Sequence, residues 1–321
     1  MPKIAVFIKA SLLAGVLGAA LALPAAAETR LRAGVFSPPD TTWGVPFKLF
    51  ADHVNETGKG IVRIDVMGPD AIPAVEQVNA LRGGVLDMVA TPPGFYKQSL
   101  FEANAQDLSS MTLAEQRASG GYAALQELTR EKVQAELLTT YGTGVNFHLY
   151  LTEQVEKPKD LEGLRLRSQP IFGPMFSDLG ISGSVISIPE TYTALERGVV
   201  KGYAFARWGV QDLGWDRLTK VRVEPGFYSV VVNILMNEQR YKSLTVEERK
   251  VIDDAVVWFE EMLPAYKAQE DAKHLAAQES AGIKSVDFGA DFATRAADVY
   301  WEEMAKSSPE SIARLRPLLQ K

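Results

Sequence analysis

The sequence predicts a two-domain α/β protein. Short β-rich runs alternate with helical runs, the length suits two domains, and the longest helical pattern starts at Thr245. Strand–helix–strand crossovers of this length favour parallel strands. A chain of 321 residues fits two domains of about 100 to 200 residues each.

The first 27 residues predict an export signal. Lys3 and Lys9 give a positive start, residues 10–23 are apolar and uncharged, and Ala25-Ala26-Ala27 suits a cleavage site. A membrane anchor is the alternative, but this apolar run is shorter than the ~20 residues that span a bilayer. We expect a periplasmic protein of 321 − 27 = 294 residues, cleaved after Ala27.

The net charge and the cysteine content narrow the range of functions that the protein can have. The signal carries two of the 34 basic residues and no acidic one, so the mature chain has 32 basic and 40 acidic residues, a net charge of −8. Nucleic acid is therefore not an expected partner. The absence of cysteine removes thiol nucleophiles and cysteine metal sites. We expect a monomer without metal or cofactor.

The first half of the chain predicts one α/β unit. Residues 112–138 predict a helix interrupted at Gly120-Gly121, followed by a turn. The other expected elements are strands at 31–36, 61–67 and 86–91, and helices starting near 44 and 74.

A second α/β unit is predicted between Lys157 and Trp208. Its expected elements are strands at 164–168, 185–188 and from 200, and helices at 171–179 and 189–198. The β-rich runs 147–152 and 228–236 cross between the units as a two-strand hinge. The predicted domains are 28–146 with about 232–265, and 147–231 with about 266–321.

A long helix of about residues 246–280 is expected to lie along both domains. Thr245 and Glu248 form a capping box, in which each side chain accepts from an early backbone N–H. At 1.5 Å per residue the helix covers ~50 Å, and Pro264 is expected to kink it.

Two cations, Arg167 and Arg207, fall where predicted strands end. Ligands of open α/β sheets bind beyond the carboxyl ends of strands, and a guanidinium matches a carboxylate. The alternative is that each arginine makes a structural ion pair or is solvated.

Catalytic motifs are absent from the sequence. There is no Gly-x-Ser-x-Gly elbow, phosphate loop or His-Glu-x-x-His motif, and the three histidines are scattered singly. We therefore do not expect an enzyme.

The run from Lys157 to Gly202 resembles the signature region of a transporter family. Lys-Pro-x-Asp-Leu-x-Gly-Leu-x-Leu-Arg, then Leu-Gly, then Ile-Pro-Glu-x-Tyr-x-Ala-Leu-x-x-Gly-Val-Val-x-Gly is similar to the extracytoplasmic solute-binding proteins of TRAP (tripartite ATP-independent periplasmic) transporters, of the DctP-like kind. Weaker similarities extend over residues 46–88 and 244–252.

This resemblance implies a clam-shell, periplasmic-binding-protein fold with a long C-terminal helix as a spine. It implies capture of a small organic acid and delivery to the small and large TRAP membrane subunits, driven by an ion gradient. Arg167 matches the family's signature arginine, which makes it the expected carboxylate ligand. A ligand-sensing subunit and, less favoured, a periplasmic enzyme remain alternatives.

The chain departs from the sialic-acid-binding members of the family. Phe147 and Phe205 fall where those members carry an arginine and an asparagine, and Tyr203-Ala204 replaces a polar pair. Aromatic walls favour a flat apolar body, so we expect a monocarboxylate such as a benzoate-like acid, with Arg207 as the candidate for a second polar group. The alternative is a small aliphatic keto or hydroxy acid. Further candidate wall residues are Trp43, Tyr96, Phe172 and Trp208.

The exported protein should begin at Glu28. The order of positive start, apolar run and small residues motivates this prediction. Intact mass spectrometry of the secreted product gives the mature terminus. Recovery of the protein in the membrane fraction with its apolar segment retained would contradict it.

Overall fold

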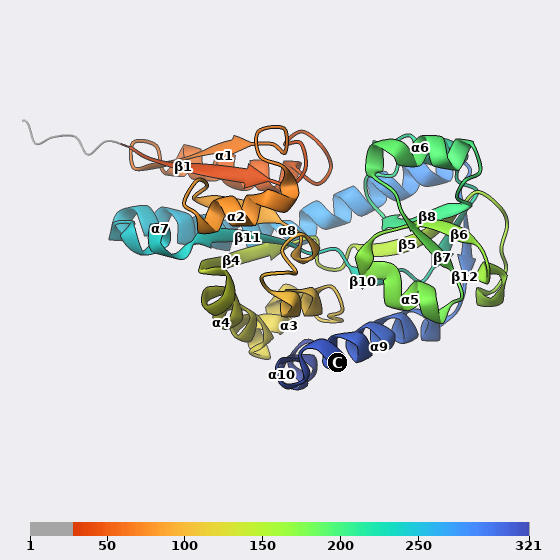
Figure 1. Cartoon of the computed structure of the whole chain (residues 1–321). Coiled ribbons are helices and arrows are strands. Elements are labelled where there is room, and N and C mark those ends of the chain that lie inside the picture. The colour runs from red at the N-terminus through yellow and green to blue at the C-terminus, as the bar shows by residue number, and fades with distance from the viewer. Residues whose placement is uncertain (1–27, 321) are drawn as a thin grey trace, which may run out of the picture.

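The computed structural model describes residues 28–320. Its strands form two sheets, one toward each end of an elongated molecule (Figure 1). We call each sheet with its covering helices a lobe. The predicted signal peptide lies outside the described residues, and the domain boundaries given above stay predictions. No helix within 28–320 is long and apolar enough to cross a membrane.

The first sheet has five strands in the order β2-β1-β3-β11-β4. As the sequence predicts, β1 runs parallel to β2 and β3, whereas β11 returns antiparallel between β3 and β4. The strands are β1 (Thr29–Val35), β2 (Val62–Met67), β3 (Met88–Thr91), β4 (Ala135–Tyr141) and β11 (Val232–Asn237).

Strand β4 corrects a sequence expectation. The predicted helix over 112–138 is two helices, α3 (Leu113–Ala118) and α4 (Gly121–Val133). Gln134 takes a left-handed conformation, with φ of 57°, and this conformation ends α4. The following run, rich in leucine, threonine and tyrosine, is almost wholly buried and pairs with β11.

The second sheet has seven strands, six of them in the order β12-β9-β5-β8-β6-β7, with β10 paired to β5. Strand β6 is parallel to β7 and β8, and β5 is antiparallel to β8. The strands are β5 (Asn146–Leu151), β6 (Arg165–Ser168), β7 (Ser182–Val185), β8 (Gly202–Ala206), β9 (Val221–Glu224), β10 (Phe227–Ser229) and β12 (Lys284–Asp287).

Strand β7 begins and ends three residues before the predicted 185–188. Ile188 instead begins α6 (Ile188–Glu196), with Pro189 in its first turn, where a missing N–H costs nothing. The apolar run around Val185 gave the wrong bounds for this strand. It suggested a buried strand, but β7 is an edge strand and the Val185 side chain is largely exposed.

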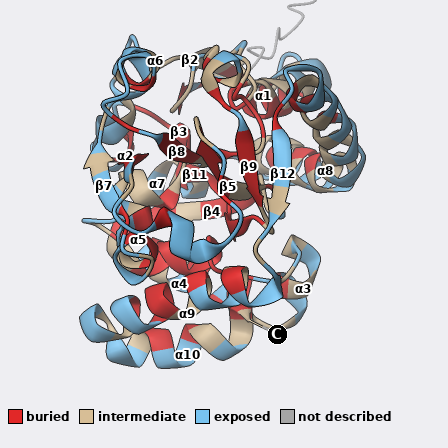
Figure 2. Cartoon of the chain, turned by 90° about the vertical axis from the view of Figure 1, so that its right-hand side faces the viewer, coloured by how far each residue is buried: buried red, intermediate tan, exposed pale blue. Residues whose placement is uncertain are grey.

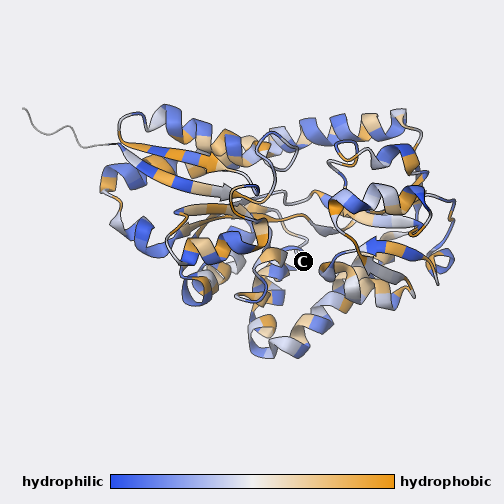
Figure 3. Cartoon of the chain, turned by 45° about the horizontal axis from the view of Figure 1, so that its top comes forward, coloured by the Kyte–Doolittle hydropathy of each residue, from blue (hydrophilic) through white to orange (hydrophobic). Residues whose placement is uncertain are grey.

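Short helices and turns cover both sheets. Figure 2 shows buried positions on the inner strands, exposed or intermediate positions on the edge strands β7 and β12, and exposed positions on the helices. Figure 3 shows the helices carrying both hydrophobic and hydrophilic positions. The remaining short elements are α1 (Val45–Thr57), α2 (Gln77–Arg82), α5 (Gly173–Asp178), α7 (Glu238–Ser243), α9 (Ala290–Ser307), α10 (Pro309–Leu319) and the 3-10 turns η1 (Ala74–Glu76), η2 (Pro93–Phe95), η3 (Phe101–Gln106), η4 (Pro158–Leu161), η5 (Pro170–Phe172) and η6 (Trp215–Leu218).

Helix α8 (Val246–Ser280) is the predicted spine. The capping box of Thr245 and Glu248 is present, and the 35-residue helix extends along both lobes (Figure 1). In its first half Phe259 packs against Phe50 of α1 at 5.6 Å between ring centroids. Near its end Gln278 donates to the Arg207 carbonyl in the second lobe. The helix continues through Pro264, and the expected kink stays a prediction.

Besides α8, the chain crosses between the sheets at 142–145, after β4, and at 230–231, before β11. The second position lies within the expected run 228–236, but the first comes before the expected run 147–152, most of which is strand β5 of the second sheet. Gly142 has φ of 90°, and a Cβ there would lie 2.7 Å from the Val230 oxygen. A glycine is therefore required where the two crossings touch.

Candidate functional site

Arg167 is a fully buried cation near the end of β6. It pairs in register with Tyr203 of β8 and is 2% exposed. Its Nε donates to the Ile186 carbonyl at 3.1 Å, and its Nη1 to the Ala204 carbonyl at 3.4 Å. These bonds engage two of the five N–H donors of a guanidinium.

The Arg167 guanidinium has no carboxylate counter-ion within the described residues. Its protein partners are the two carbonyls, and burial lowers its pKa to about 10. At that pKa the group remains a cation at neutral pH. A buried cation normally has a partner charge, so this site is suited to an anion supplied from outside.

An aromatic cluster centred on Trp215 lies beside the guanidinium. Trp215 of η6 lies with its ring 5.7 Å from the Arg167 Cζ, and it packs edge-on against Phe205 at 5.1 Å and Tyr203 at 4.8 Å. Alternation along β8 and its register with β6 put Arg167, Tyr203 and Phe205 on one face of the sheet. Trp215 was not predicted as a site residue, because no motif surrounds it in the sequence.

Phe147 and Phe172 lie together on the other face of the second sheet. Phe147 pairs with Ala206, one position beyond Phe205, so its side chain alternates to the opposite side. It packs edge-on against Phe172 at 5.1 Å. The structure thus separates Phe147 from Phe205 across the sheet, although both stand near the same end of the strands.

Trp43 and Trp208 join the two lobes. Trp43, from the loop before α1, stacks on Trp208, which follows β8, at 5.3 Å between ring centroids. Beside them the Thr42 hydroxyl donates to Asp212 at 2.6 Å. The Trp208 indole N–H donates to Asp271 of α8 at 2.9 Å. These two predicted wall residues are therefore an interlobe contact.

Arg207 is engaged by the protein. Its Nε and Nη2 lie 3.3 Å from the His148 Nε2, and its Nη1 lies 3.9 Å from Asp271. Burial lowers the His148 pKa to about 4, which leaves the ring neutral and able to accept a hydrogen bond. The structural-ion-pair alternative describes Arg207 better than ligand binding.

Tyr96 is also a core residue. It is 3% exposed, and its hydroxyl accepts a 2.7 Å hydrogen bond from Asn233 within the first lobe. Burial raises its pKa.

Phe36 and Phe95 are further candidate wall residues, which were not predicted from the sequence. They follow β1 and β3, are half-buried, and pack edge-on at 5.9 Å. Because parallel strands end at the same edge of a sheet, these rings stand where ligands of α/β proteins bind. Their signal was position: Phe36 is the last residue of the predicted strand 31–36, and Phe95 lies in the loop that follows the predicted strand 86–91.

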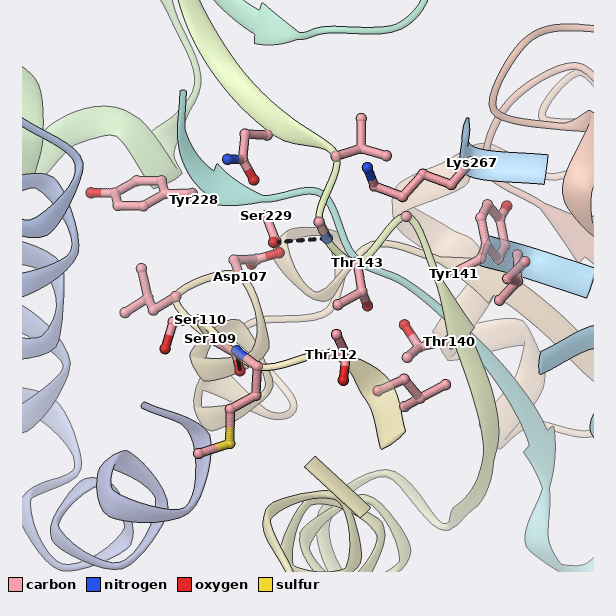
Figure 4. A pocket seen from close by; sticks show the side chains of 18 of the residues that line it. Asp107, Ser109, Ser110, Thr112, Thr140, Tyr141, Thr143, Tyr228, Ser229 and Lys267 are labelled. Carbon is pink, nitrogen blue, oxygen red and sulfur yellow. Dashed lines mark hydrogen bonds between the residues drawn. The ribbon is translucent and has the colours of Figure 1, made fainter. Parts of the chain in front are cut away.

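A large cavity lies apart from Arg167, at the crossings between the lobes. It measures 870 Å³ and is lined by the first crossing, by β10 just before the second crossing, by α8 and by α9 (Figure 4). We call it the hinge cavity. Its polar lining includes Asp107, Ser109, Thr143, Ser229 and Lys267.

Asp107 is the unusual group in the hinge cavity. The residue is 4% exposed, and no hydrogen bond or ion pair to its carboxyl group occurs within residues 28–320. Burial holds its pKa well above the usual range. Tyr96, Tyr228 and Tyr300 are near enough for the Asp107 charge to raise their pKa values, and they offer no positive charge.

Two lobes joined by strand crossings and a spine helix, with an unpaired buried cation at one sheet's end, define a two-lobed solute-binding protein. The model of the bacterial extracellular solute-binding proteins, family 7, matches residues 33–307, and the chain belongs to this family. This match confirms the predicted solute-binding protein of the DctP-like kind.

Curated relatives match over different lengths. An uncharacterised Sinorhizobium fredii protein is 28% identical over 56% of this chain and 34% of its own length. A Verminephrobacter eiseniae solute-binding protein is 23% identical over 82% of this chain and 81% of its own. A Nostoc protein named a monocarboxylate 2-oxoacid-binding periplasmic protein is 24% identical over 59% of this chain and 54% of its own. The chain thus spans about a third to four fifths of these relatives.

Solved structures share the fold. A TRAP periplasmic solute-binding protein from a Sulfitobacter species with bound β-D-galacturonate has a TM-score of 0.78 and 17% identity, covering 91% of this chain and 99% of its own. A Bordetella pertussis solute receptor binding pyroglutamic acid has a TM-score of 0.77 and 14% identity, with the same coverage. These structures confirm the predicted two-lobed fold.

Asp107→Asn should stabilise the protein increasingly as pH rises. Because the folded-state pKa of Asp107 is raised, folding disfavours its ionised form. The wild type therefore loses stability from about pH 4, the usual aspartate pKa, up through the raised pKa. Asparagine removes this loss. Thermal melts of both proteins at pH 4, 6 and 8 should show a gap in melting temperature that widens with pH.

The matched control is Asp254→Asn, an exposed carboxylate paired with Lys250 on α8. It changes net charge equally and should show no widening gap. An Asp107→Asn protein that is less stable than wild type at pH 8 would contradict the assignment.

Proposed function

We propose that this protein captures a monocarboxylate with an aromatic or otherwise apolar body between its lobes, and delivers it in the periplasm to TRAP membrane subunits. The observation that carries the proposal is the buried Arg167 guanidinium. It lacks a counter-ion within residues 28–320, and its two hydrogen bonds to carbonyls leave other N–H donors for a ligand. A carboxylate would satisfy both the charge and the fork geometry.

The apolar body of the ligand is proposed from the groups near the guanidinium. Phe205 and Trp215 supply ring surface beside Arg167, and hydroxyl partners for a sugar acid are not among its contacts. A polyhydroxylated ligand would leave hydroxyls unpaired at ~1 to 3 kcal/mol each. An aromatic ring would instead gain burial and edge-to-face packing.

A small aliphatic keto or hydroxy acid is the second candidate. The Nostoc relative named for monocarboxylate 2-oxoacids favours it. In this case Phe205 and Trp215 would reduce the cavity around Arg167 instead of stacking on the ligand. The sugar acid in the Sulfitobacter structure belongs to a protein that is 17% identical, a level at which the likeness extends to the fold and no further.

Closure of the lobes is the proposed means of capture. The Trp43–Trp208 stack and the Thr42–Asp212 hydrogen bond already link the lobes beside the second sheet's strand ends. A ligand held there would lose water, which strengthens its charge-assisted hydrogen bonds. The closed surface would then be recognised by the membrane subunits. Co-purification with a permease would distinguish this role from a ligand-sensing subunit.

Arg167→Ala should weaken carboxylate binding by roughly thirtyfold to several thousandfold. Removing one partner of a desolvated charge pair costs about 2 to 5 kcal/mol. Arg167→Lys should also bind poorly, because an ammonium cannot reproduce the guanidinium fork. Isothermal titration calorimetry measures both affinities.

Arg165→Ala is the matched control, because Arg165 is exposed on the same strand. It should retain the wild-type affinity. If circular dichroism shows an intact fold and Arg167→Ala binds the acid as tightly as the wild type, the proposed role of Arg167 is wrong.

A panel of four acids tests the ligand class. We expect 4-hydroxybenzoate to bind more tightly than sialic acid, a C4 dicarboxylate or pyruvate, because its flat ring suits the aromatic surround. Parallel calorimetric titrations give the ranking. Preference for sialic acid or the dicarboxylate would refute the apolar monocarboxylate, and preference for pyruvate would select the second candidate.

A further inference from the structure

The hinge cavity has the size and construction of a ligand site. Its 870 Å³ falls within the range of about 300 to 1,000 Å³ typical of small-molecule pockets. Its walls come from both lobes: Thr112 and Tyr141 from the first, Phe227 and Ala293 from the second. It does not include Arg167, Phe205 or Trp215, so it is separate from the proposed carboxylate site.

The charges in the hinge cavity leave one group unmatched. Lys267 pairs with Asp271 at 2.5 Å, and Arg117 pairs with Glu260. The Asp107 carboxyl has neither a cation nor a hydrogen-bond donor among the described residues, although it is 96% buried. Figure 4 shows it lining the cavity beside Ser229.

The surroundings of Asp107 fit a cation with an apolar body. Phe227, Tyr228 and Trp208 contribute aromatic side chains to the cavity, and aromatic faces attract ammonium groups. Leu108, Val145 and Leu263 add aliphatic surface. No cluster of three or more metal-ligating side chains exists within residues 28–320, so the single carboxyl matches a monovalent group better than a divalent ion.

We propose that the hinge cavity is a second binding site, which takes a small amphipathic amine. The ammonium group pairs with the Asp107 carboxylate, and the apolar body lies against the aromatic and aliphatic walls. The bound ammonium supplies the counter-charge that residues 28–320 do not provide at this position. Ser229, whose hydroxyl accepts from the Gly144 N–H at 3.1 Å, borders the pair.

Calorimetric titration with 2-phenylethylamine and hexylamine tests this site in the intact protein. We expect saturable binding of at least one amine, with a dissociation constant below about 1 mM. The neutral analogues 2-phenylethanol and hexanol should bind at least roughly tenfold more weakly, because they bring no charge to Asp107.

Three variants locate the bound amine. Asp107→Asn keeps the side-chain shape but should weaken amine binding by roughly thirtyfold or more, as expected when one partner of a buried charge pair is removed. Ala293→Phe should also weaken it by filling the cavity from α9. Asp254→Asn, with the same change in net charge at an exposed position, should bind like the wild type.

Three results would overturn the proposal. The first is no saturable binding of either amine. The second is equal affinity for each amine and its neutral analogue. The third is unchanged amine affinity in Asp107→Asn.

Discussion

The Arg167 guanidinium is held in the protein interior by two backbone carbonyls, without an opposite charge among residues 28–320. Burying a cation is costly unless it is paired, and the lowered pKa of Arg167 expresses that cost. The fold keeps the cation in place because β6 is fixed between β7 and β8, and because Trp215 covers its face. The cation is therefore desolvated when the protein folds, so that anion binding does not have to include this cost.

The connections between the lobes set how this cation can be reached. Two short crossings touch at Gly142 and Val230, while α8 contacts the first lobe through Phe259 and the second through Gln278. Rotation at the crossings would change contacts such as the Trp43–Trp208 stack. Hinges of this kind usually depend on a few residues in connecting segments. The hinge cavity lies at these same crossings, so its volume would change with lobe position.

Local signals in the sequence predicted most of the fold. The capping box at Thr245, the apolar runs of the first three strands and the signature around Arg167 all depend on neighbouring residues, and the structure agrees with them. Strand β4 was missed because Gln134, a residue that gives no stop signal, ends α4 in a left-handed conformation. The short strands β9 and β12 were missed because four-residue runs carry little periodicity.

The site was predicted less completely, because side-chain partners depend on tertiary contacts. Sequence position correctly put Arg167 and Arg207 near strand ends, but it could not reveal that His148 and Asp271 engage Arg207. The contact of Trp215 with Arg167 and the unmatched carboxyl of Asp107 likewise arise from segments distant in the chain.

The central claim is that Arg167 holds the ligand carboxylate. A crystal structure with a bound organic acid tests it most directly. The account predicts both carboxylate oxygens at about 2.7 to 2.9 Å from Arg167 nitrogens. A carboxylate bound by Arg207 or in the hinge cavity, with Arg167 still bonded to its two carbonyls alone, would contradict it.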